Sequence, residues 1–265
     1  PVTVNKLVCR LLLEKKKQTF HLKEVFVSPN LVDDEEINLR DTCRALAGNL
    51  DKYIIDNTVV AVSWGNTLNC LAGQIQPLKA KDIKVVQLNG GVAKSASSTG
   101  ASQIVDALTM AGHGIGYMFP VPAIVDSKHT SEILQEETQV KNVLRLAKEA
   151  EVSIFSIGAL SKDSILYEVE YLKDEDFQAL EKNKAVGDIA SRYFDINGNI
   201  ALKELDDRVV GFGLEELREK EWTIAIAVGV NKVDAIIGAL RAGFMNVLYT
   251  DEKTAREILN RNLLG

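Results

Sequence analysis

The hydrophobic residues of this chain gather in short continuous runs with amphipathic segments between them. Six runs predict buried strands: TVVAVS (58–63), IKVVQL (83–88), GYMFPVPAIV (116–125), EVSIFSIG (151–158), WTIAIAVG (222–229) and MNVLYT (245–250). Because polar residues do not alternate within these runs, we expect strands that are covered on both faces. Residues 132–150 carry apolar positions at helical spacing and predict an amphipathic helix. This alternation predicts an α/β fold with a doubly wound, mostly parallel, Rossmann-like sheet.

Two regions depart from this alternation. Residues 1–57 contain a possible strand, KEVFVSP (23–29), and a helix near residues 34–53 with Asp33 or Asp34 as its N-cap. We interpret residues 1–57 as a layer packed on the sheet before its first central strand. Residues 160–215 are richer in charge and contain the sequence DINGN (195–199), which predicts a hairpin turn. We interpret residues 160–215 as a smaller inserted lid over the strand ends.

The composition excludes several classes of protein. A length of 265 residues leaves open one large domain or two small ones. The net charge of -6 argues against a DNA-binding surface built from this chain alone. Three widely spaced cysteines and three scattered histidines indicate a reduced, cytoplasmic protein with no metal site and no cofactor. No apolar run reaches the length of a membrane-spanning helix, so we expect no membrane partner.

The turn after the run 58–63 is the first candidate site. Parallel sheets bind ligands at the carboxyl ends of their strands. Gly65 allows close approach of the backbone, and Asn66 and Thr67 supply donors where the next helix begins. These residues suit a phosphate, since a helix N-terminus favours anions. They equally suit a simple helix cap, and the turn alone leaves both interpretations open.

Two further turns follow the same logic. After the run 83–88, Gly90 and Gly91 permit a sharp bend before a series of hydroxyl residues that includes Thr99, which favours a binding loop. In VGVNKVDAI (228–236), Lys232 lies in the first turn of a predicted helix, where the macrodipole disfavours a cation. A bound phosphate would resolve that conflict, although a solvated lysine is the plain alternative.

The segment AVGDIASRYFDINGN (185–199) carries a fourth candidate. Asp188 and Arg192 are four residues apart and could pair on one face of a helix. Asp188 could equally accept hydrogen bonds from sugar hydroxyls.

Four motifs in this order resemble one family: VSWGNTL, QLNGGV, AVGDIASRYFDINGNI and VGVNKVDAIIGAL followed by NVLYTDEKTA. They are similar to the effector-binding domain of SorC/DeoR-type bacterial transcriptional regulators, from about Lys23 to the end of the chain. The resemblance implies a sugar-phosphate-binding domain, spanning residues 1–265, with the fold of ribose-5-phosphate isomerase and glucosamine-6-phosphate deaminase. It also implies a homodimer or homotetramer, and operator DNA bound through an N-terminal helix-turn-helix domain that this chain lacks.

The resemblance also implies roles for individual residues. Gly65, Asn66 and Thr67 match the phosphate-gripping turn of the family, and Lys232 matches its phosphate-binding lysine. Asp188, Asn89, Gly90 and Thr99 fall where the family contacts the sugar. Relatives carry lysine or arginine at the position of Asn89, and in the deoxyribose-phosphate sensor that lysine forms a Schiff base. Asparagine cannot do so, and we therefore expect non-covalent binding.

The sequence thus predicts a sensor with no catalytic residue, which binds a phosphorylated sugar and regulates carbohydrate metabolism. The alternative is an isomerase or deaminase on the same fold, for which Asp188 is the one acidic residue available as a general base. A third interpretation is an oligomerisation module whose turn residues merely cap helices. Loss of ligand affinity in Lys232→Ala would argue against that module.

Overall fold

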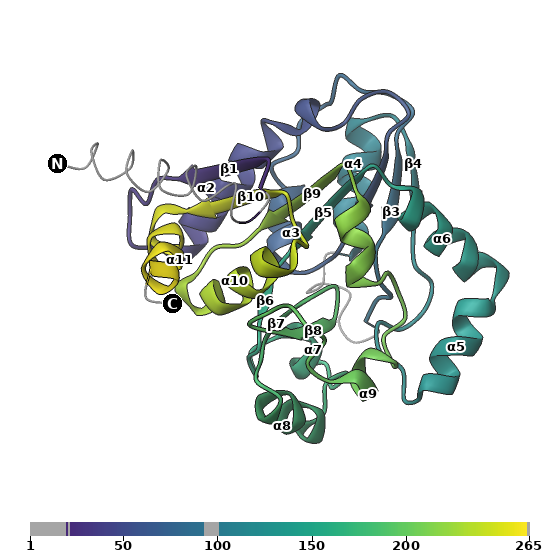
Figure 1. Ribbon diagram of the computed structural model, residues 1–265. Helices are drawn as coiled ribbons and strands as arrows, with labels where there is room; N and C mark the ends of the chain where they lie inside the picture. Colours follow the sequence, from purple (N-terminus) through teal and green to yellow (C-terminus); the bar gives the residue numbers. More distant parts are fainter. Residues whose placement is uncertain (1–19, 21, 93–100, 264–265) are drawn as a thin grey trace.

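The computed structural model describes residues 20, 22–92 and 101–263, which fold around one central parallel sheet (Figure 1). Its seven strands are β1 (Glu24–Ser28), β2 (Val59–Val62), β3 (Lys84–Gln87), β4 (Ile115–Tyr117), β5 (Val152–Ser156), β9 (Trp222–Ile226) and β10 (Val247–Asp251). They lie in the order β1-β10-β9-β5-β2-β3-β4, and every neighbouring pair is parallel. The α/β, mostly parallel fold predicted from the hydrophobic pattern is confirmed.

The strand order changes direction between β2 and β5. From β2 the chain moves outward through β3 to β4, then returns to the other side of β2 and continues through β5 to β9 and β10. The connections after β2 and β5 therefore leave the sheet in opposite directions, which opens a crevice at their carboxyl ends. Such a switch point is where doubly wound sheets bind ligands.

Helices cover both faces of this sheet because successive strand residues point to opposite sides. In β2, Val60 and Val62 pack in the core under α2 (Glu35–Ala47), α3 (Asn66–Ala72) and α4 (Ala101–Ala111). Ala61 between them belongs to the core under α6 (Thr138–Glu149), α10 (Val233–Ala242) and α11 (Glu252–Leu263). Burial on both faces explains why the strand sequences are continuously apolar. None of the helices within the described ranges is long and apolar enough to cross a membrane.

Two local expectations meet a different outcome in the structure, and a third is confirmed. The run 116–125 forms only the short strand β4, because Pro120 and Pro122 cannot donate to a neighbouring strand. The helix expected over 132–150 is two helices, α5 (Lys128–Glu136) and α6, separated by extended backbone at Glu137. The N-cap of α2 is confirmed as Asp34, whose Oδ1 accepts from the backbone N–H of Ile37 at 3.1 Å.

A smaller unit follows β5. It contains the antiparallel strands β6 (Gly158–Ala159), β7 (Ala185–Ile189) and β8 (Arg192–Asp195), with helices α7 (Ile165–Glu168), α8 (Asp174–Lys182) and α9 (Lys203–Asp206). The short 3-10 helices η1 (Leu50–Lys52), η2 (Leu214–Glu219) and η3 (Val230–Lys232) complete the fold. The residues after β8 turn back at DINGN, with the Asp195 N–H bonded to the Asn199 carbonyl at 2.9 Å. The hairpin turn predicted there is confirmed.

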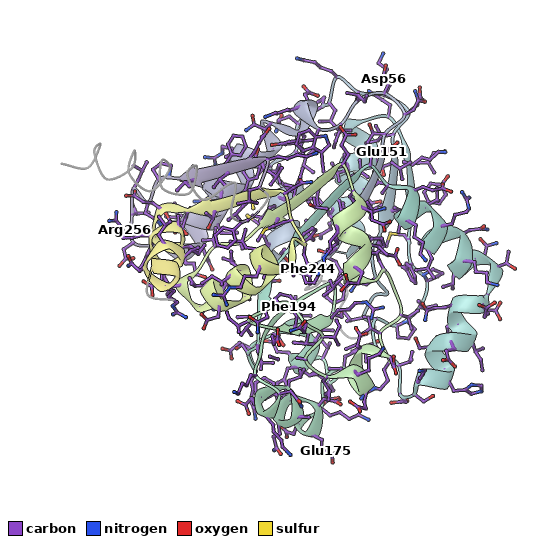
Figure 2. All side chains as sticks on the ribbon, viewed as in Figure 1. Asp56, Glu151, Glu175, Phe194, Phe244 and Arg256 are labelled. Atoms are coloured by element: carbon purple, nitrogen blue, oxygen red, sulfur yellow. The ribbon has the colours of Figure 1, made fainter. Side chains whose placement is uncertain are left out.

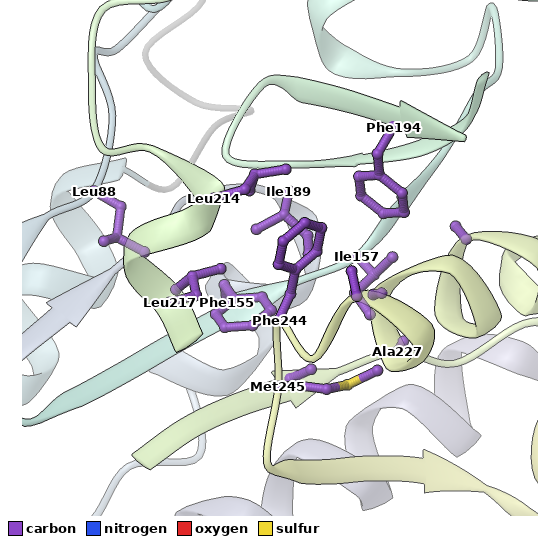
Figure 3. Packing of buried hydrophobic residues seen from close by; sticks show 14 of the residues in the cluster. Leu88, Phe155, Ile157, Ile189, Phe194, Leu214, Leu217, Ala227, Phe244 and Met245 are labelled. Carbon is purple, nitrogen blue, oxygen red and sulfur yellow. The ribbon is translucent and has the colours of Figure 1, made fainter. Parts of the chain in front are cut away.

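Phe194 joins this smaller unit to the main core. Its ring packs edge to face against Phe244 at 5.8 Å between centroids, next to Ile189 and Leu214 (Figure 3). In Figure 2 the two rings lie where the smaller unit meets the main sheet, and Glu175 marks the far end of that unit. The neighbouring Tyr193 points the other way, into a separate core with residues of α7 and α8. One face of β8 is therefore fixed to the main body.

Candidate functional site

A cavity of about 410 Å³ lies at the carboxyl ends of β2 and β5, between the main sheet and the smaller unit. The main sheet contributes the turn after β2, the residues after β5 and the loop after β9. The smaller unit contributes the segment before α7 and the turn between β7 and β8. The lining residues are Glu35, Ser63, Trp64, Gly65, Asn66, Thr67, Asn89, Ser156, Ile157, Gly158, Ala159, Ser161, Asp163, Ser164, Ile165, Leu166, Asp188, Ala190, Ser191, Asn231 and Lys232.

The turn after β2 brings backbone donors to one end of the cavity. Gly65 has a φ of 129°, a conformation that glycine adopts without strain. No side chain caps the helix α3 that begins at Asn66. Trp64 holds this turn in place, because its indole Nε1 donates to the carbonyl of Gly90 at 2.8 Å. Thr67 is buried and Asn66 is exposed, so the turn has both an inner and an outer donor side chain.

Lys232 reaches the same end of the cavity from the loop after β9. Gly229 begins that loop at a φ of 118°, and its N–H donates to Thr254 Oγ1 at 2.9 Å. Lys232 ends η3 and occupies the N-cap position of α10. Burial lowers the pKa of Lys232, and the negative charges of Glu35 and Asp188 act against that shift. A cation held at a helix N-terminus and withdrawn from water is well placed to receive an anion.

Acceptor groups gather at another wall of the cavity. Asn89 Nδ2 donates to Ser191 Oγ at 3.0 Å, and the Ser191 N–H donates to Asp188 Oδ2 at 3.1 Å. The Oδ1 of Asn89 is buried without a hydrogen-bond partner among the described residues. Loss of water contact raises the pKa of Asp188 to about 6, although the Ser191 N–H and the Lys232 charge oppose that shift. This wall can accept hydrogen bonds from hydroxyl groups.

Asp188 and Arg192 do not pair, so the helical interpretation of their spacing is wrong. They lie on β7 and β8, which form a hairpin with Ala190 and Ser191 at its tip. Arg192 turns away from the cavity and pairs with Asp206 Oδ1 at 2.6 Å. Asp188 is thereby left to face the cavity.

The structure places the predicted site residues as follows. Six of them line the one cavity: Gly65, Asn66, Thr67, Asn89, Asp188 and Lys232. Gly90 lies behind the cavity wall, where a Cβ would come within 2.4 Å of the Pro122 carbonyl oxygen and 2.5 Å of that of Val121. Its glycine is therefore required for close packing of two backbones. Thr99 lies outside the residues that the structure describes.

Several lining residues carried no sequence signal. Glu35 follows the Asp34 cap of α2 and has the appearance of an ordinary acidic residue in a first helical turn. Ser63 Oγ is buried without a hydrogen-bond partner in the described part of the chain. Ser191 and Asn231 stand in turns whose positions only the three-dimensional fold reveals. Ser191 could have been predicted from the sequence, because it lies in the same motif as Asp188.

The cavity therefore has a donor end and an acceptor wall. The donor end combines the uncapped start of α3 with Lys232, and the acceptor wall combines Asp188 with Asn89. Phosphates suit the first arrangement and hydroxyl groups the second. Across the ranges that the structure describes, no group of three or more His, Cys, Asp or Glu side chains could hold a metal ion.

Comparison with known proteins identifies relatives over most of the chain. The family model described as "Putative sugar-binding domain" matches residues 8–260. The Deoxyribonucleoside regulator of Bacillus subtilis (strain 168) is 33% identical over 220 residues, which cover 83% of this chain and 70% of that regulator. The transcriptional regulator LsrR of Escherichia coli (strain K12) is 30% identical over 250 residues, 92% of this chain and 75% of LsrR.

A solved structure agrees with these relatives. A DeoR family transcriptional regulator from Listeria monocytogenes superposes with a TM-score of 0.84 at 27% sequence identity. The match covers 92% of this chain and 97% of that one. The agreement therefore extends over the main sheet and the smaller unit alike.

Proposed function

The chain belongs to the sugar-binding domain family of SorC/DeoR-type bacterial transcriptional regulators, and we propose that its cavity binds a phosphorylated sugar non-covalently. The observation that carries this proposal is the division of one cavity into a donor end and an acceptor wall. The phosphate lies on Gly65, Asn66, Thr67 and Lys232. The sugar hydroxyls meet Asn89 and Asp188.

The phosphate assignment rests on two elements that converge from distant parts of the chain. The start of α3 offers backbone N–H groups, and Lys232 adds a full positive charge from the loop after β9. A charge-assisted contact of this kind contributes about 1.5–3 kcal/mol. A neutral sugar would bring no negative charge to Lys232, whose burial is unfavourable for the ammonium, whereas a phosphate would add one.

Non-covalent binding follows from the side chains on the acceptor wall. Asn89 carries an amide, which does not condense with an aldehyde. Lys232 is the sole lysine among the described residues that line the cavity, and its ammonium belongs to the donor end. Reduction of a protein–ligand mixture with borohydride should therefore leave the protein mass unchanged.

The bound sugar would regulate DNA binding through the association of domains. Ligand binding shifts an equilibrium between association states of the domain, and thereby DNA binding through a helix-turn-helix domain outside this chain, in the cytoplasm. The shift can be no larger than the difference between the affinities of the ligand for the two states. The curated relatives are named as regulators, which supports a sensor without catalytic residues.

One observation favours an enzyme of the isomerase or deaminase class as the second candidate. The pKa of Asp188 is raised to about 6, which is close to the value that a general base needs at neutral pH. A general base also needs a partner that stabilises the negative charge developing on the sugar. Asn89 and Ser191 lie on the same wall as Asp188, and the Asn89 amide already donates a hydrogen bond to the Ser191 hydroxyl.

A ligand screen on Lys232→Ala tests the proposal. Wild-type protein is mixed with C5 and C6 sugar phosphates, their unphosphorylated forms and inorganic phosphate, and thermal unfolding is measured. At about 100 times the dissociation constant, a ligand should stabilise the protein by about 2.7 kcal/mol. We expect Lys232→Ala to weaken phosphosugar binding about 10- to 100-fold, which corresponds to the loss of one charge-assisted contact.

Two controls complete that screen. Lys182→Ala, at the exposed end of α8, should bind as the wild type does. NMR spectra of the protein–ligand mixture should show an unchanged sugar after hours. Steady conversion of the sugar would establish the enzyme instead, and equal affinity in Lys232→Ala would remove the phosphate assignment.

A further inference from the structure

Glu35 reaches the donor end of the cavity from a third direction. It lies in the first turn of α2, almost two hundred residues before Lys232 in the sequence, and lines the same cavity. A Cβ on Gly229 would come within 2.9 Å of Glu35 Oε1 and 2.6 Å of Asn231 Oδ1. The carboxylate therefore lies against the loop that carries Lys232.

The charge balance of the cavity makes this position significant. Among the described residues, Lys232 is the one cation that lines the cavity, whereas Glu35, Asp163 and Asp188 are acidic. A phosphate that enters would add negative charge to a site that already has an excess of carboxylates. At least one of those carboxylates must give way or lose its charge for the phosphate to bind well.

Glu35 is a carboxylate that is free to move. Its side chain is exposed, and it has no hydrogen-bond partner among the described residues. Asp188, in contrast, is held by the Ser191 N–H on the acceptor wall. An exposed glutamate can turn into solvent by rotating its side chain, at little cost to the fold.

We propose that Glu35 is the counter-ion of Lys232 in the empty cavity and that the phosphate of the ligand takes its place. This inference rests on the proposed phosphate-binding function. Glu35 then sets the affinity threshold of the sensor, because every anion that binds must first displace the carboxylate. It also ties occupancy of the cavity to the first turn of α2.

The electrostatics of Lys232 agree with this assignment. Of the negative groups that raise the pKa of Lys232 against the effect of burial, Glu35 has the largest influence and Asp188 the next. The carboxylate of Glu35 thus does in the empty cavity what a phosphate would do in the filled one. It opposes the fall in the pKa of the lysine that burial causes.

The next residue along the chain provides a matched control. Glu36 carries the same charge in the same helical turn, is also exposed and does not line the cavity. The experiment is calorimetric titration of inorganic phosphate and of the best sugar phosphate into wild type, Glu35→Gln and Glu36→Gln at two salt concentrations. Unphosphorylated sugar serves as the neutral ligand.

We expect Glu35→Gln to bind both phosphates about three- to tenfold more tightly than the wild type at low salt. The gain should shrink at high salt, since Glu35 is exposed to solvent and its charge is screened. Glu36→Gln should match the wild type, and no variant should change the affinity for unphosphorylated sugar.

Three outcomes would overturn the role of Glu35. Weaker phosphate binding by Glu35→Gln would make Glu35 a residue that supports the bound ligand. Equal gains in Glu35→Gln and Glu36→Gln would reflect only the net charge of the domain. A wild type that binds unphosphorylated sugar and no phosphate would refute the proposed function itself. In that case Lys232→Ala would bind the sugar as tightly as the wild type does, which distinguishes this failure from a failure of the Glu35 role alone.

Discussion

The surroundings of Asp188 in the fold set the charge of its carboxyl group. The side chain faces the cavity, accepts one backbone hydrogen bond from Ser191 and lies within the field of Lys232. Loss of contact with water outweighs these two stabilising contacts. The pKa of Asp188 therefore rises from an ordinary 3.8 to about 6. Asp188 therefore begins to take up a proton only slightly below neutral pH. Its state decides whether the acceptor wall can also donate a hydrogen bond.

The pH dependence of stability should reveal this shift. A pKa raised in the folded state means that the ionised carboxyl is less favourable in the fold than in the unfolded chain, so stability falls as pH rises from about 4 through 6. The rise of the pKa from 3.8 to about 6 corresponds to about 3 kcal/mol in total. Asp188→Asn removes the titration. We expect the stability of wild type relative to this variant to drop by about 2.4 kcal/mol between pH 4 and pH 7.

Urea unfolding of both proteins at several pH values measures that difference. Asn at position 188 keeps an oxygen for the Ser191 N–H, so the hydrogen bond is preserved while the charge is lost. Parallel stability curves for wild type and Asp188→Asn would show that Asp188 titrates as it does in the unfolded chain.

At the scale of elements, the turns after β2 and β3 pack closely against each other. Ser63 and Leu88 end neighbouring parallel runs, and the turns after them must pass each other without leaving backbone groups unpaired. Gly90 achieves this by donating its N–H to the Val210 carbonyl at 3.1 Å and accepting from Trp64 at 2.8 Å. The side-chain-free Cα lets the strand end approach the segment 121–122.

Gly90 and the adjacent Gly91 offer a paired test of that packing. A Cβ on Gly90 would lie 2.4 Å from the Pro122 carbonyl oxygen, whereas a Cβ on Gly91 would meet no atom of the described residues within 4 Å. We expect Gly90→Ala to destabilise the protein by at least about 2 kcal/mol, because backbone atoms must shift. Gly91→Ala should stay within about 0.5 kcal/mol of the wild type. Chemical denaturation measures both, and equal stabilities would mean that the loop relaxes freely.

The sequence could predict most of the central strands but not the hairpin of β7 and β8. Continuous apolar runs identify β2, β3, β5, β9 and β10, because strands buried on both faces must be apolar throughout. The hairpin of β7 and β8 gave no such sign. Its tip has φ values of 51° at Ala190 and 69° at Ser191, without the Asn-Gly pair that usually signals such a turn. A four-residue spacing therefore suggested a helix, and only the fold shows that Asp188 and Arg192 point apart.

Some residues of the candidate site could be predicted from the sequence and others could not. Gly65 and Lys232 follow strand ends in the sequence, and the rule that parallel strands bind ligands at their carboxyl ends brings them together. Glu35 enters the cavity from a helix on one face of the sheet, and Ser191 from an irregular turn. Their places depend on how whole elements pack, which no local pattern records.

At the scale of the whole molecule, the cavity lies between two bodies that share a core. Phe194 and Ile189 anchor β7 and β8 in the main hydrophobic core, so the acceptor wall is fixed to the sheet. The segment 161–166 reaches the cavity from the other side and packs with α8 in a second core, which also contains Tyr193 and Trp64. We therefore expect any closure over the ligand to involve residues 161–166 and not the entire segment 160–215.

Hydrogen exchange can distinguish a closing segment from a rigid wall. A sugar phosphate that spans the cavity should slow amide exchange in residues 65–68, 230–232 and 161–166 together. Inorganic phosphate fills the donor end alone, so it should protect 65–68 and 230–232 and leave 161–166 at the rate of the empty protein. Amides of α5, which lies away from the cavity, serve as the internal reference. Local opening governs exchange in such peripheral segments, so protection there reports contact with the ligand and not global stability. If the sugar phosphate left 161–166 unprotected, the ligand would be held by the sheet and the β7–β8 turn alone, and the segment would be a wall of the cavity with no closing motion.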